Sequence, residues 1–369
     1  MPMTKINNSQ TTSNQEKNNP QSEVLDFAVI GAGIAGLTFA NKMNSLGFSI
    51  AVLEKARGTG GRLSSKRVKN SQHDAMAFDL GCTSFFAGSK SFKEQLDHWH
   101  QLGILVPWLK DEQDREHYVA TPRNSSLTRF LSKDLTCHFS TKVDSIRQYN
   151  GCWEINYNCD EGSSDNCIYA KNIILAAPAP QALDLLPNGV GIELKNQLAS
   201  VELAPQWVLA IEVDDECVDL DDLSFPSSEI IHSISIESNK PTREHQESSK
   251  ILQIQATAHW SENNIDADKV FVERSILIAL EQITGETVIA LNSHLHRWLY
   301  STVSSGLESQ TAYLWDTSLS KNHGLGLIGD YFDTHHFGIE ASWHSAIALA
   351  DYLSSAKGNQ PFIRADQND

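Results

Sequence analysis

Three glycines that directly follow a short apolar run constrain this sequence more than any other feature. The run at 26–30, Asp-Phe-Ala-Val-Ile, is typical of a strand, and Gly31-Ala32-Gly33-Ile34-Ala35-Gly36 comes next. In this pattern the first glycine permits a tight turn, the second lets a pyrophosphate approach, and the third lets helix and strand pack closely. The spacing therefore predicts a dinucleotide-binding turn formed by Gly31, Ala32, Gly33, Ala35 and Gly36, with phosphate at a helix N-terminus.

The following segments complete the same unit. Apolar residues recur with helical periodicity over 34–46, and Gly47 stands where the helix would end. An apolar second strand is predicted at 50–53. Glu54 follows it, about twenty residues after the third glycine, where a carboxylate accepts hydrogen bonds from ribose hydroxyls.

A second glycine-rich segment selects the cofactor. The run Glu54-Lys55-Ala-Arg57-Gly-Thr-Gly-Gly61-Arg62 resembles the second glycine motif of flavoproteins of the glutathione-reductase and amine-oxidase type. This resemblance implies noncovalently bound FAD, with Lys55, Arg57, Gly61 and Arg62 along its pyrophosphate and ribityl chain. Arginine guanidinium groups there would neutralise phosphate charge. The alternative for each arginine is a solvated loop side chain, and this alternative is stronger for Arg57.

A third segment narrows the resemblance. Residues 77–86 are similar to the segment beside the flavin in renalases and renalase-like bacterial oxidoreductases. The resemblance implies that Gly81, Thr83 and Ser84 lie at the flavin, with Thr83 and Ser84 in place of the Gln-Tyr pair of that group. Cys82 between them is interpreted as a packing residue.

Two further segments extend the resemblance to the cofactor. Strands predicted around 143–146, 152–157 and 168–169 resemble a hairpin of FAD-binding folds, which puts the backbone of Val143 at the adenine. Near the C-terminus, Gly329 and Asp330 are implied to meet the ribityl and phosphate groups. A helix beginning at Gly338 and Ile339 and running through 353 would direct its positive end at the flavin.

The middle of the chain supplies the candidate substrate region. Alternating apolar residues at 207–213 and 251–258 predict strands of an antiparallel sheet. Trp207, His296 and Arg297 are the candidate substrate contacts. A core role for Trp207, and an Arg–Trp stack or a domain-interface ion pair for His296 and Arg297, remain open as alternatives.

The 369 residues exceed what one core usually holds, so two joined domains are expected. The fold class is α/β, with a Rossmann-like FAD-binding domain of the glutathione-reductase type and a second, mixed-sheet substrate domain. We assign 24–84, 121–180 and 292–356 to the FAD-binding domain and 85–120 and 181–291 to the substrate domain. Residues 1–23 and 357–369 are expected to be tails, the former being poor in apolar residues.

Charge and composition exclude several other classes of protein. A net charge of −17 disfavours nucleic acid and anionic membranes as partners. The N-terminus lacks the pattern of a secretory signal, and no segment approaches the roughly 20 apolar residues that span a bilayer, so we expect a cytoplasmic protein. The six cysteines form no C-x-x-C pair, and His335-His336 lacks a further ligand cluster, so we predict no metal. The oligomeric state stays open.

The renalase-like resemblance also implies a reaction. Members of that group pass hydride from isomeric dihydro-NAD(P) to flavin N5, and O₂ then takes the electrons to give H₂O₂. Such chemistry needs alignment more than acid and base, which fits a sequence without a recognisable catalytic triad. We therefore expect a small-molecule substrate and O₂ as partners and name no catalytic side chain. A flavin amine oxidase acting on a small amine is one alternative, and a non-catalytic flavin-binding redox sensor, suggested by Thr83, Ser84 and Ala341, is the other.

Overall fold

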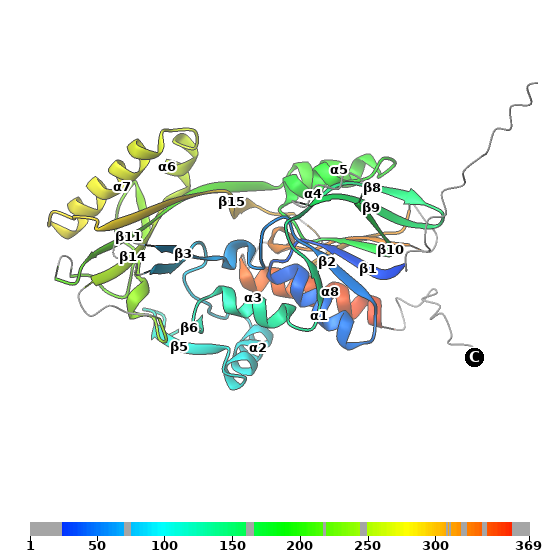
Figure 1. The fold of residues 1–369 in the computed structure, drawn as a ribbon, viewed down its shortest axis with the longest axis horizontal. Helices are drawn as coiled ribbons and strands as arrows, with labels where there is room; N and C mark the ends of the chain where they lie inside the picture. Colours follow the sequence, from blue (N-terminus) through cyan, green and yellow to red (C-terminus); the bar gives the residue numbers. More distant parts are fainter. Residues whose placement is uncertain are drawn as a thin grey trace, which may run out of the picture.

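Two sheets organise the chain in a computed structural model (Figure 1). The structure describes residues 24–69, 75–159, 166–216, 219–243, 249–307, 309, 311–318, 323–333 and 338–355. Both predicted tails and the pair His335-His336 lie outside these ranges. Within them, no helix is long and apolar enough to cross a membrane.

The first sheet contains the predicted dinucleotide-binding unit. Its strand order is β16-β17-β10-β1-β2-β7, and β9 and β8 continue from β10 as an antiparallel extension. Strands β17, β10, β1, β2 and β7 run parallel to one another, as a Rossmann-like fold requires, whereas β16 pairs antiparallel with β17. The strands are β1 (Leu25–Ile30), β2 (Ile50–Leu53), β7 (Thr136–His138), β8 (Thr141–Tyr149), β9 (Cys152–Cys159), β10 (Asn166–Leu175), β16 (Leu314–Asp316) and β17 (Leu325–Leu327).

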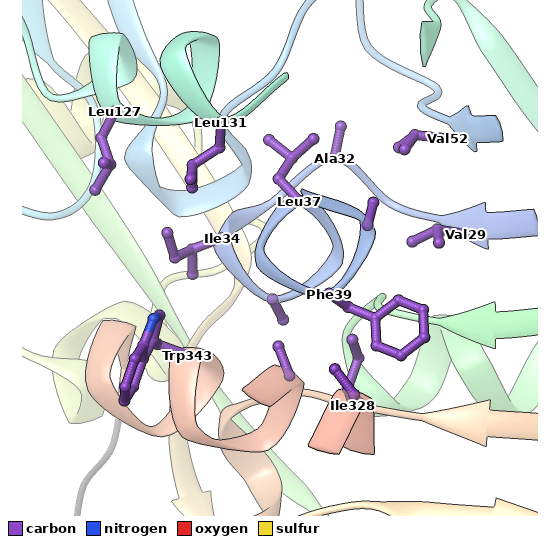
Figure 2. Packing of buried hydrophobic residues seen from close by; sticks show 14 of the residues in the cluster. Val29, Ala32, Ile34, Leu37, Phe39, Val52, Leu127, Leu131, Ile328 and Trp343 are labelled. Atoms are coloured by element: carbon purple, nitrogen blue, oxygen red, sulfur yellow. The ribbon is translucent and has the colours of Figure 1, made fainter. Parts of the chain in front are cut away.

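Helices cover both faces of this sheet, because each parallel strand is apolar on both sides. On one face, α1 (Ile34–Ser45), α3 (Ser125–Ser132) and α8 (Ile339–Ser354) bury Val29 and Val52 (Figure 2). On the other face, α4 (Ala179–Leu185) and α5 (Ile192–Ala199) cover Ile30 and Leu53. The predicted strand, helix and second strand at 26–53 are confirmed, and so is the helix through 353.

The second sheet is antiparallel, as predicted, in the order β12-β13-β14-β11-β15. Helices α6 (Ala258–Asn263) and α7 (Lys269–Thr284) lie at its outer face (Figure 1). The long strands β11 and β15 extend from this sheet toward the first one (Figure 1). The strands are β11 (Glu202–Asp214), β12 (Leu223–Ser224), β13 (Ile231–Ile236), β14 (Ser249–Ala256) and β15 (Asn292–Ser305), with the short helix η2 (Glu237–Asn239) after β13.

Two small hairpins join the halves. One consists of β3 (Ser65–Lys69) and β4 (Ala75–Asp79), and it packs on the inner face of the second sheet through Phe78. The other consists of β5 (Leu105–Lys110) and β6 (Glu116–Ala120), beside α2 (Lys90–Gln101). Short helices η1 (Gly61–Leu63) and η3 (Asp330–Phe332) complete the elements.

The structure refines the proposed division of the chain. Residues 292–356 were assigned to the FAD-binding domain, but their first strand, β15, pairs with β11 in the second sheet. The hairpin β3–β4, within 24–84, also packs on that sheet. We therefore propose that β15 and this hairpin belong with the substrate domain. Helix α2, within 85–120, packs instead in the core of the first sheet through Phe92, Leu96 and Trp99, so we propose that it belongs with the FAD-binding domain. The other boundaries stay proposals.

Candidate functional site

The turn between β1 and α1 shows what each of its glycines does. A Cβ atom on Gly31 would stand 2.7 Å from the carbonyl oxygen of Ala176, and one on Gly36 would stand 2.1 Å from that of Gly31. These two glycines are required by the protein's own packing. Gly33 differs, because a Cβ atom there would meet nothing within 4 Å and its φ of −82° is ordinary. The space beside Gly33 suits a ligand.

The start of α1 leaves main-chain donors at the same place. No side chain caps this helix, and its first turn holds no acidic residue. The first helical hydrogen bond runs from the Leu37 N–H to the Gly33 carbonyl, so the N–H groups of the first turn point out of the helix. Their partial positive charge fits a phosphate group.

Glu54 closes the turn from the end of β2. Its Oε2 accepts the Ala32 N–H at 2.8 Å, and its Oε1 accepts the Ala56 N–H at 2.8 Å. An ionised carboxylate has about four acceptor positions, so two remain for hydroxyl groups such as those of a ribose. The main-chain donor of Ala32 is bound by Glu54, which makes Ala32 a supporting residue of the turn.

The second glycine segment packs directly on the first. The Gly60 N–H donates to the Ala32 carbonyl at 3.1 Å, and a Cβ atom on Gly61 would lie 3.5 Å from the Gly33 Cα. The third segment packs on the second, because the Cys82 N–H donates to the Arg62 carbonyl at 2.9 Å. Three glycine segments that are distant in sequence therefore converge at one place.

Arg62 joins the fourth segment to these three. Its two terminal nitrogens bind both oxygens of the Asp330 carboxylate, and Nη1 also donates to the Ser301 carbonyl at 3.0 Å. Burial opposes the charge of Arg62, but the Asp330 carboxylate raises its pKa above the ordinary value. In this structure Asp330 compensates the charge of Arg62. We therefore expect the two residues to hold one another in place as well as to contact the cofactor.

The helix α8 begins at the same convergence. Gly338 has a φ of 80°, the left-handed region that favours glycine, and Ile339 is the first helical residue. The Gly329 N–H donates to the Ser345 Oγ of this helix at 3.0 Å. Glu340 in its first turn accepts the Gly88 N–H at 2.7 Å, which ties the helix to the segment after Ser84.

The remaining predicted cofactor contacts lie at the edges of this region. Val143 is buried on β8 in the same apolar cluster as Leu53. Lys55 is exposed and its Nζ donates to Gln181 Oε1 at 3.0 Å. Arg57 is exposed, which agrees with the alternative that it is a solvated loop side chain.

The Gly81–Ser84 turn is held by amide side chains that the sequence analysis missed. Gln255 Nε2 donates to the Gly81 carbonyl at 2.6 Å, and Thr83 Oγ1 donates to Gln253 Oε1 at 2.9 Å. Asn124 Nδ2 donates to the Cys82 carbonyl at 2.8 Å. Residues two apart on a strand lie on the same face, so the spacing of Gln253 and Gln255 on β14 could have indicated a polar face in the sequence.

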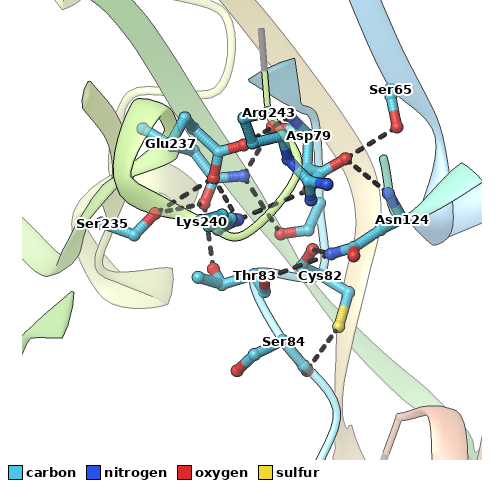
Figure 3. Close-up of polar contacts among 12 residues, drawn as sticks. Ser65, Asp79, Cys82, Thr83, Ser84, Asn124, Ser235, Glu237, Lys240 and Arg243 are labelled. Atoms are coloured by element: carbon cyan, nitrogen blue, oxygen red, sulfur yellow. Dashed lines mark hydrogen bonds and ion pairs between the residues drawn. The ribbon is translucent and has the colours of Figure 1, made fainter. Parts of the chain in front are cut away.

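A buried charge cluster lies beneath this turn (Figure 3). The cluster consists of Asp79, Glu237, Lys240 and Arg243. Asp79 accepts from Arg243 at 2.8 Å, from Ser65 Oγ at 2.7 Å and from the Asn124 N–H at 3.0 Å. Lys240 contacts both carboxylates, and Glu237 accepts the Asp79 N–H at 3.0 Å. Two negative and two positive charges thus stand together away from water.

The two carboxylates respond differently to burial. Burial opposes the ionisation of Asp79, but the nearby charges of Lys240 and Arg243 hold its pKa below the usual range. Burial, together with the charge of Asp79, raises the pKa of Glu237 despite the same two cations. Asp79 is therefore the firmly ionised member.

Burial also makes the thiol of Cys82 unreactive. Burial raises its pKa to about 12, so it stays protonated near neutral pH. A thiol in this state is a poor nucleophile. This environment agrees with the interpretation of Cys82 as a packing residue.

The structure separates the three predicted substrate contacts. Trp207 is buried between the second sheet and its helices, and its Nε1 donates to the Asn264 carbonyl at 3.1 Å. Arg297 stands beside it on that outer face, with its guanidinium 5.8 Å from the Trp207 ring and bound to the Ile265 carbonyl. For these two residues the structure favours the core and Arg–Trp stack alternatives, because strand alternation turns them away from the glycine segments.

His296 lies on the opposite, inner face of β15. Its register partner is Val208, which is also the partner of Gln255. The neighbouring Trp298 ring lies 4.6 Å from the imidazole and donates from Nε1 to the Leu80 carbonyl at 2.8 Å. Burial lowers the pKa of His296 to about 4, and the neighbouring His294 and the cations Lys66 and Lys269 add to this effect. His296 is therefore neutral near pH 7 and faces the Gly81–Ser84 side.

Within the described residues, no group of three or more His, Cys, Asp or Glu is arranged to hold a metal ion. What the site offers is a cradle for a dinucleotide and, beside it, a wall of amide and aromatic side chains. The fold and the site together thus define a protein with a Rossmann-like dinucleotide-binding domain.

Comparison with known proteins agrees and is more specific. Residues 29–99 match the model of an NAD(P)-binding Rossmann-like domain. Renalase of Mus musculus is 25% identical over 302 residues, which cover 76% of this chain and 86% of that protein. Among solved structures, a protein of Exiguobacterium sp. 255-15 described as a protoporphyrinogen oxidase has a TM-score of 0.67 at 12% identity, covering 90% of this chain and 99% of its own. Putrescine oxidase with bound putrescine has a TM-score of 0.50 at 11% identity, covering 74% and 84%.

The structural matches establish the shared fold, and the renalase match establishes homology over most of the chain. The chain is therefore similar to renalase over most of its length and shares the fold of these two oxidases.

Proposed function

We propose that this protein binds FAD noncovalently and oxidises isomeric dihydro-NAD(P), with O₂ as the electron acceptor and H₂O₂ as a product. Bound FAD supplies the hydride acceptor, its N5 atom, and the protein supplies position and electrostatics. We place this reaction in the cytoplasm. The substrate assignment depends mainly on one observation, the charge around the inner face of the second sheet.

The carboxylates of that inner face are already engaged, since Glu212 on β11 is buried and accepts from Ser249 Oγ and Asn292 Nδ2. Burial, His294 and the cations Lys66 and Lys269 lower the pKa of His296, so it is neutral near pH 7, and of the two cations Lys66 lies on the β3–β4 hairpin that packs on this face. The nearest carboxylates beneath the turn, Asp79 and Glu237, are buried and paired with Lys240 and Arg243. A dinucleotide that carries phosphates is attracted to such a face, whereas an ammonium substrate would need an available carboxylate. This favours a dihydronicotinamide over an amine.

The residues of the cradle fit the cofactor in the proposed way. The open space at Gly33 and the uncapped start of α1 suit the pyrophosphate, and the unused acceptor positions of Glu54 suit the ribose. Gly61 and Arg62 would contact its pyrophosphate and ribityl chain, and Gly81, Thr83 and Ser84 would lie at the flavin. Gly329, Asp330, Gly338 and Ile339 would complete the site.

The decisive experiment uses the purified yellow protein without oxygen. Isomeric dihydronicotinamides should bleach the flavin absorbance within the turnover time, and primary and secondary amines should not. Admission of O₂ should then restore the absorbance and release H₂O₂ in a one-to-one ratio with substrate. Bleaching by amines alone would replace this proposal with an amine oxidase.

A matched pair of lysine variants tests the charge argument. Lys66→Gln should raise KM for the phosphate-bearing substrate by about 3- to 10-fold, the effect of one partly screened charge, and leave kcat nearly unchanged. Lys133→Gln serves as the control, since Lys133 is exposed at the end of α3. An unchanged KM in Lys66→Gln would remove the charge-based support for a substrate that carries phosphates.

A flavin-binding redox sensor is the second candidate, because Thr83 and Ser84 replace the Gln-Tyr pair expected beside the flavin. Both residues are engaged with protein partners, Thr83 with Gln253 and Ser84 with His117. Bleaching by neither class of donor on the turnover timescale would favour the sensor over the oxidase.

A further inference from the structure

Alternate residues of β15 place three ring side chains in a row on the inner face of the second sheet. His294, His296 and Trp298 share this face, because residues two apart on a strand point the same way. Trp298 marks the end nearest the Gly81–Ser84 turn, since its Nε1 donates to the Leu80 carbonyl at 2.8 Å. A strand rises about 3.3 Å per residue, so His296 and His294 stand roughly 7 and 13 Å farther along it. The row therefore leads away from the turn that we expect at the flavin.

Lys66 reaches this row from the β3–β4 hairpin. Its partner on the neighbouring strand is Phe78, so the two side chains lie on the same face of the hairpin, the face that packs on the second sheet. The Phe78 ring lies 5.6 Å from the imidazole of His294. The ammonium group of Lys66 and the imidazole of His294 thus flank one buried aromatic ring.

The polar groups at this place are not used by the protein itself. Within the described part of the chain, Lys66, His294 and His296 have no hydrogen-bond or ion-pair partner for their side chains, and all three are partly exposed. Burial and the nearby cations, Lys66 among them, lower the pKa of both imidazoles, so each is neutral near pH 7. A neutral imidazole carries one N–H donor, and an ammonium group carries three. Several donors therefore face one place and are available to an anionic ligand.

A carboxylate closes the outer end of the row. Glu212 lies opposite Asn292, the next residue outward on this face, and accepts from Asn292 Nδ2 and Ser249 Oγ. Its negative charge opposes an anion beyond His294. An anion is therefore favoured between Lys66 and the two imidazoles, and not farther out.

We propose that Lys66, His294 and His296 form a subsite for one phosphate group, the one attached to the nicotinamide ribose of the substrate. This inference rests on the proposed function, because it takes a dihydronicotinamide nucleotide as the substrate. One ribose separates the nicotinamide ring from this phosphate, so a ring held at the flavin puts the phosphate a short way along the row. The ammonium and imidazole N–H groups then donate to its oxygens. The adenylate half lies beyond the subsite and contributes little to affinity.

Binding of oxidised ligands tests the subsite without turnover. The yellow protein is titrated by calorimetry with nicotinamide riboside, nicotinamide mononucleotide and NAD⁺. The mononucleotide should bind about 10- to 100-fold more tightly than the riboside, the range for a charge-assisted hydrogen bond. NAD⁺ should gain less than about 3-fold over the mononucleotide, since its second phosphate passes Glu212. Equal affinity for riboside and mononucleotide would overturn the subsite, as would a large further gain with NAD⁺.

Matched variants of one strand locate the effect. Lys66→Gln should weaken binding of the mononucleotide by about 3- to 10-fold and leave binding of the riboside unchanged. Lys66→Arg keeps the charge and should retain most of the preference for the mononucleotide. Arg67→Gln removes an exposed charge from the opposite face of the same strand and should change neither affinity. Equal weakening by Lys66→Gln and Arg67→Gln would assign the preference to net charge and would overturn the subsite.

His294→Phe tests the imidazole separately, because it keeps a ring against Phe78 and removes the N–H donor. The variant should bind the mononucleotide about 3- to 10-fold more weakly and the riboside as before. Added salt should weaken binding of the mononucleotide more in wild type than in Lys66→Gln, since screening acts on the charge that this variant lacks. A loss of affinity shared by both ligands in His294→Phe would contradict a contact to phosphate.

The proposed function and the subsite can fail separately. Bleaching of the flavin by amines alone would remove the dihydronicotinamide substrate and, with it, the assignment of this phosphate. Bleaching by the reduced riboside and the reduced mononucleotide with equal KM would leave the proposed function standing and would overturn the subsite.

Discussion

At the scale of single residues, substitutions of Gly33 and Gly36 should have different effects on folding, although the two glycines share one turn. Gly33→Val should fold, with a loss of about 1 kcal/mol from the N-cap position, because its side chain enters open space. It should purify without flavin, since that space is where the pyrophosphate would lie. Absorbance at flavin wavelengths and urea unfolding measure the two effects.

Gly36→Ala is the matched control for this test. Its Cβ would stand 2.1 Å from the Gly31 carbonyl oxygen, so helix and strand must separate. Overpacking of this kind costs about 1–3 kcal/mol of unfolding free energy. A yellow Gly33→Val protein would show that the cofactor does not occupy the space at this glycine.

His296 gives a prediction for the dependence of stability on pH. Its pKa is about 4 in the folded protein, compared with an ordinary value of 6.5, so the unfolded chain binds the extra proton first as pH falls. The folded state therefore loses stability as pH falls from about 6.5 toward 4, and it regains that stability as pH rises.

Replacement of this histidine isolates its contribution. Between about pH 7.5 and 5, wild-type protein should lose about 1 kcal/mol more unfolding free energy than His296→Gln, after discounting for partial exposure. Urea unfolding at the two pH values measures the difference. Parallel losses in the two proteins would show that His296 titrates normally in the folded state.

At the scale of elements, strand β14 controls the Gly81–Ser84 turn. Gln255→Met keeps the side-chain volume but removes the donor to the Gly81 carbonyl. Loss of one such hydrogen bond should cost about 1 kcal/mol and weaken FAD binding by roughly 5-fold, if the turn lies at the flavin. Fluorescence titration of the apoprotein with FAD measures this change.

Leu209→Ala on the neighbouring strand supplies the comparison. Leu209 is buried on the outer face of the second sheet, among its helices. Its truncation should cost about 2–5 kcal/mol of stability and leave FAD affinity unchanged under folding conditions. Equal affinity for FAD in Gln255→Met and wild type would show that β14 does not influence cofactor binding.

The elements also show what the sequence could and could not reveal. The turn at Gly31 was predictable because its glycines, strand, helix and acid are local in sequence. The strand predicted near 168–169 is part of a longer strand, β10, whose two halves pair with different partners. Periodicity within a short window cannot show that change of partner.

Contacts between distant segments were the main part that could not be predicted. Ser84 meets His117, and Thr83 meets Gln253, only because folding brings their segments together. Whether the Trp207 side chain points to the inner or the outer face of the second sheet depends on the register of β11. The presence of a tryptophan in the sequence does not specify that register. The burial of Glu237, Lys240 and Arg243 could not be predicted either, because Asp79, which they contact, lies far away in sequence.

At the scale of the whole molecule, the buried charge cluster connects the halves. Asp79 comes from the β3–β4 hairpin, whereas Glu237, Lys240 and Arg243 follow β13 of the second sheet. Asn124, which binds Asp79 through its main chain, leads into α3 on the first sheet. We therefore expect the two sheets of the wild-type protein to unfold in a single transition.

Lys240→Met tests this coupling, because it leaves Glu237 without its nearest cation in a buried place. Breaking a buried ion pair on one side costs about 3–5 kcal/mol. Hydrogen exchange in urea should show β4 and β14 losing protection before β1 and β10 in this variant, whereas all four lose it together in wild type. Lys42→Met, which breaks an exposed pair with Asp351, should cost less than about 1 kcal/mol and keep one transition.

Adding Glu237→Gln to Lys240→Met should recover part of the loss. The amide oxygen can still accept the Asp79 N–H, while the uncompensated negative charge is gone. Recovery with a single transition restored would show that charge balance, rather than the bulk of the lysine side chain, joins the halves. If Lys240→Met kept one transition at wild-type stability, the cluster would be excluded as the link between the two sheets.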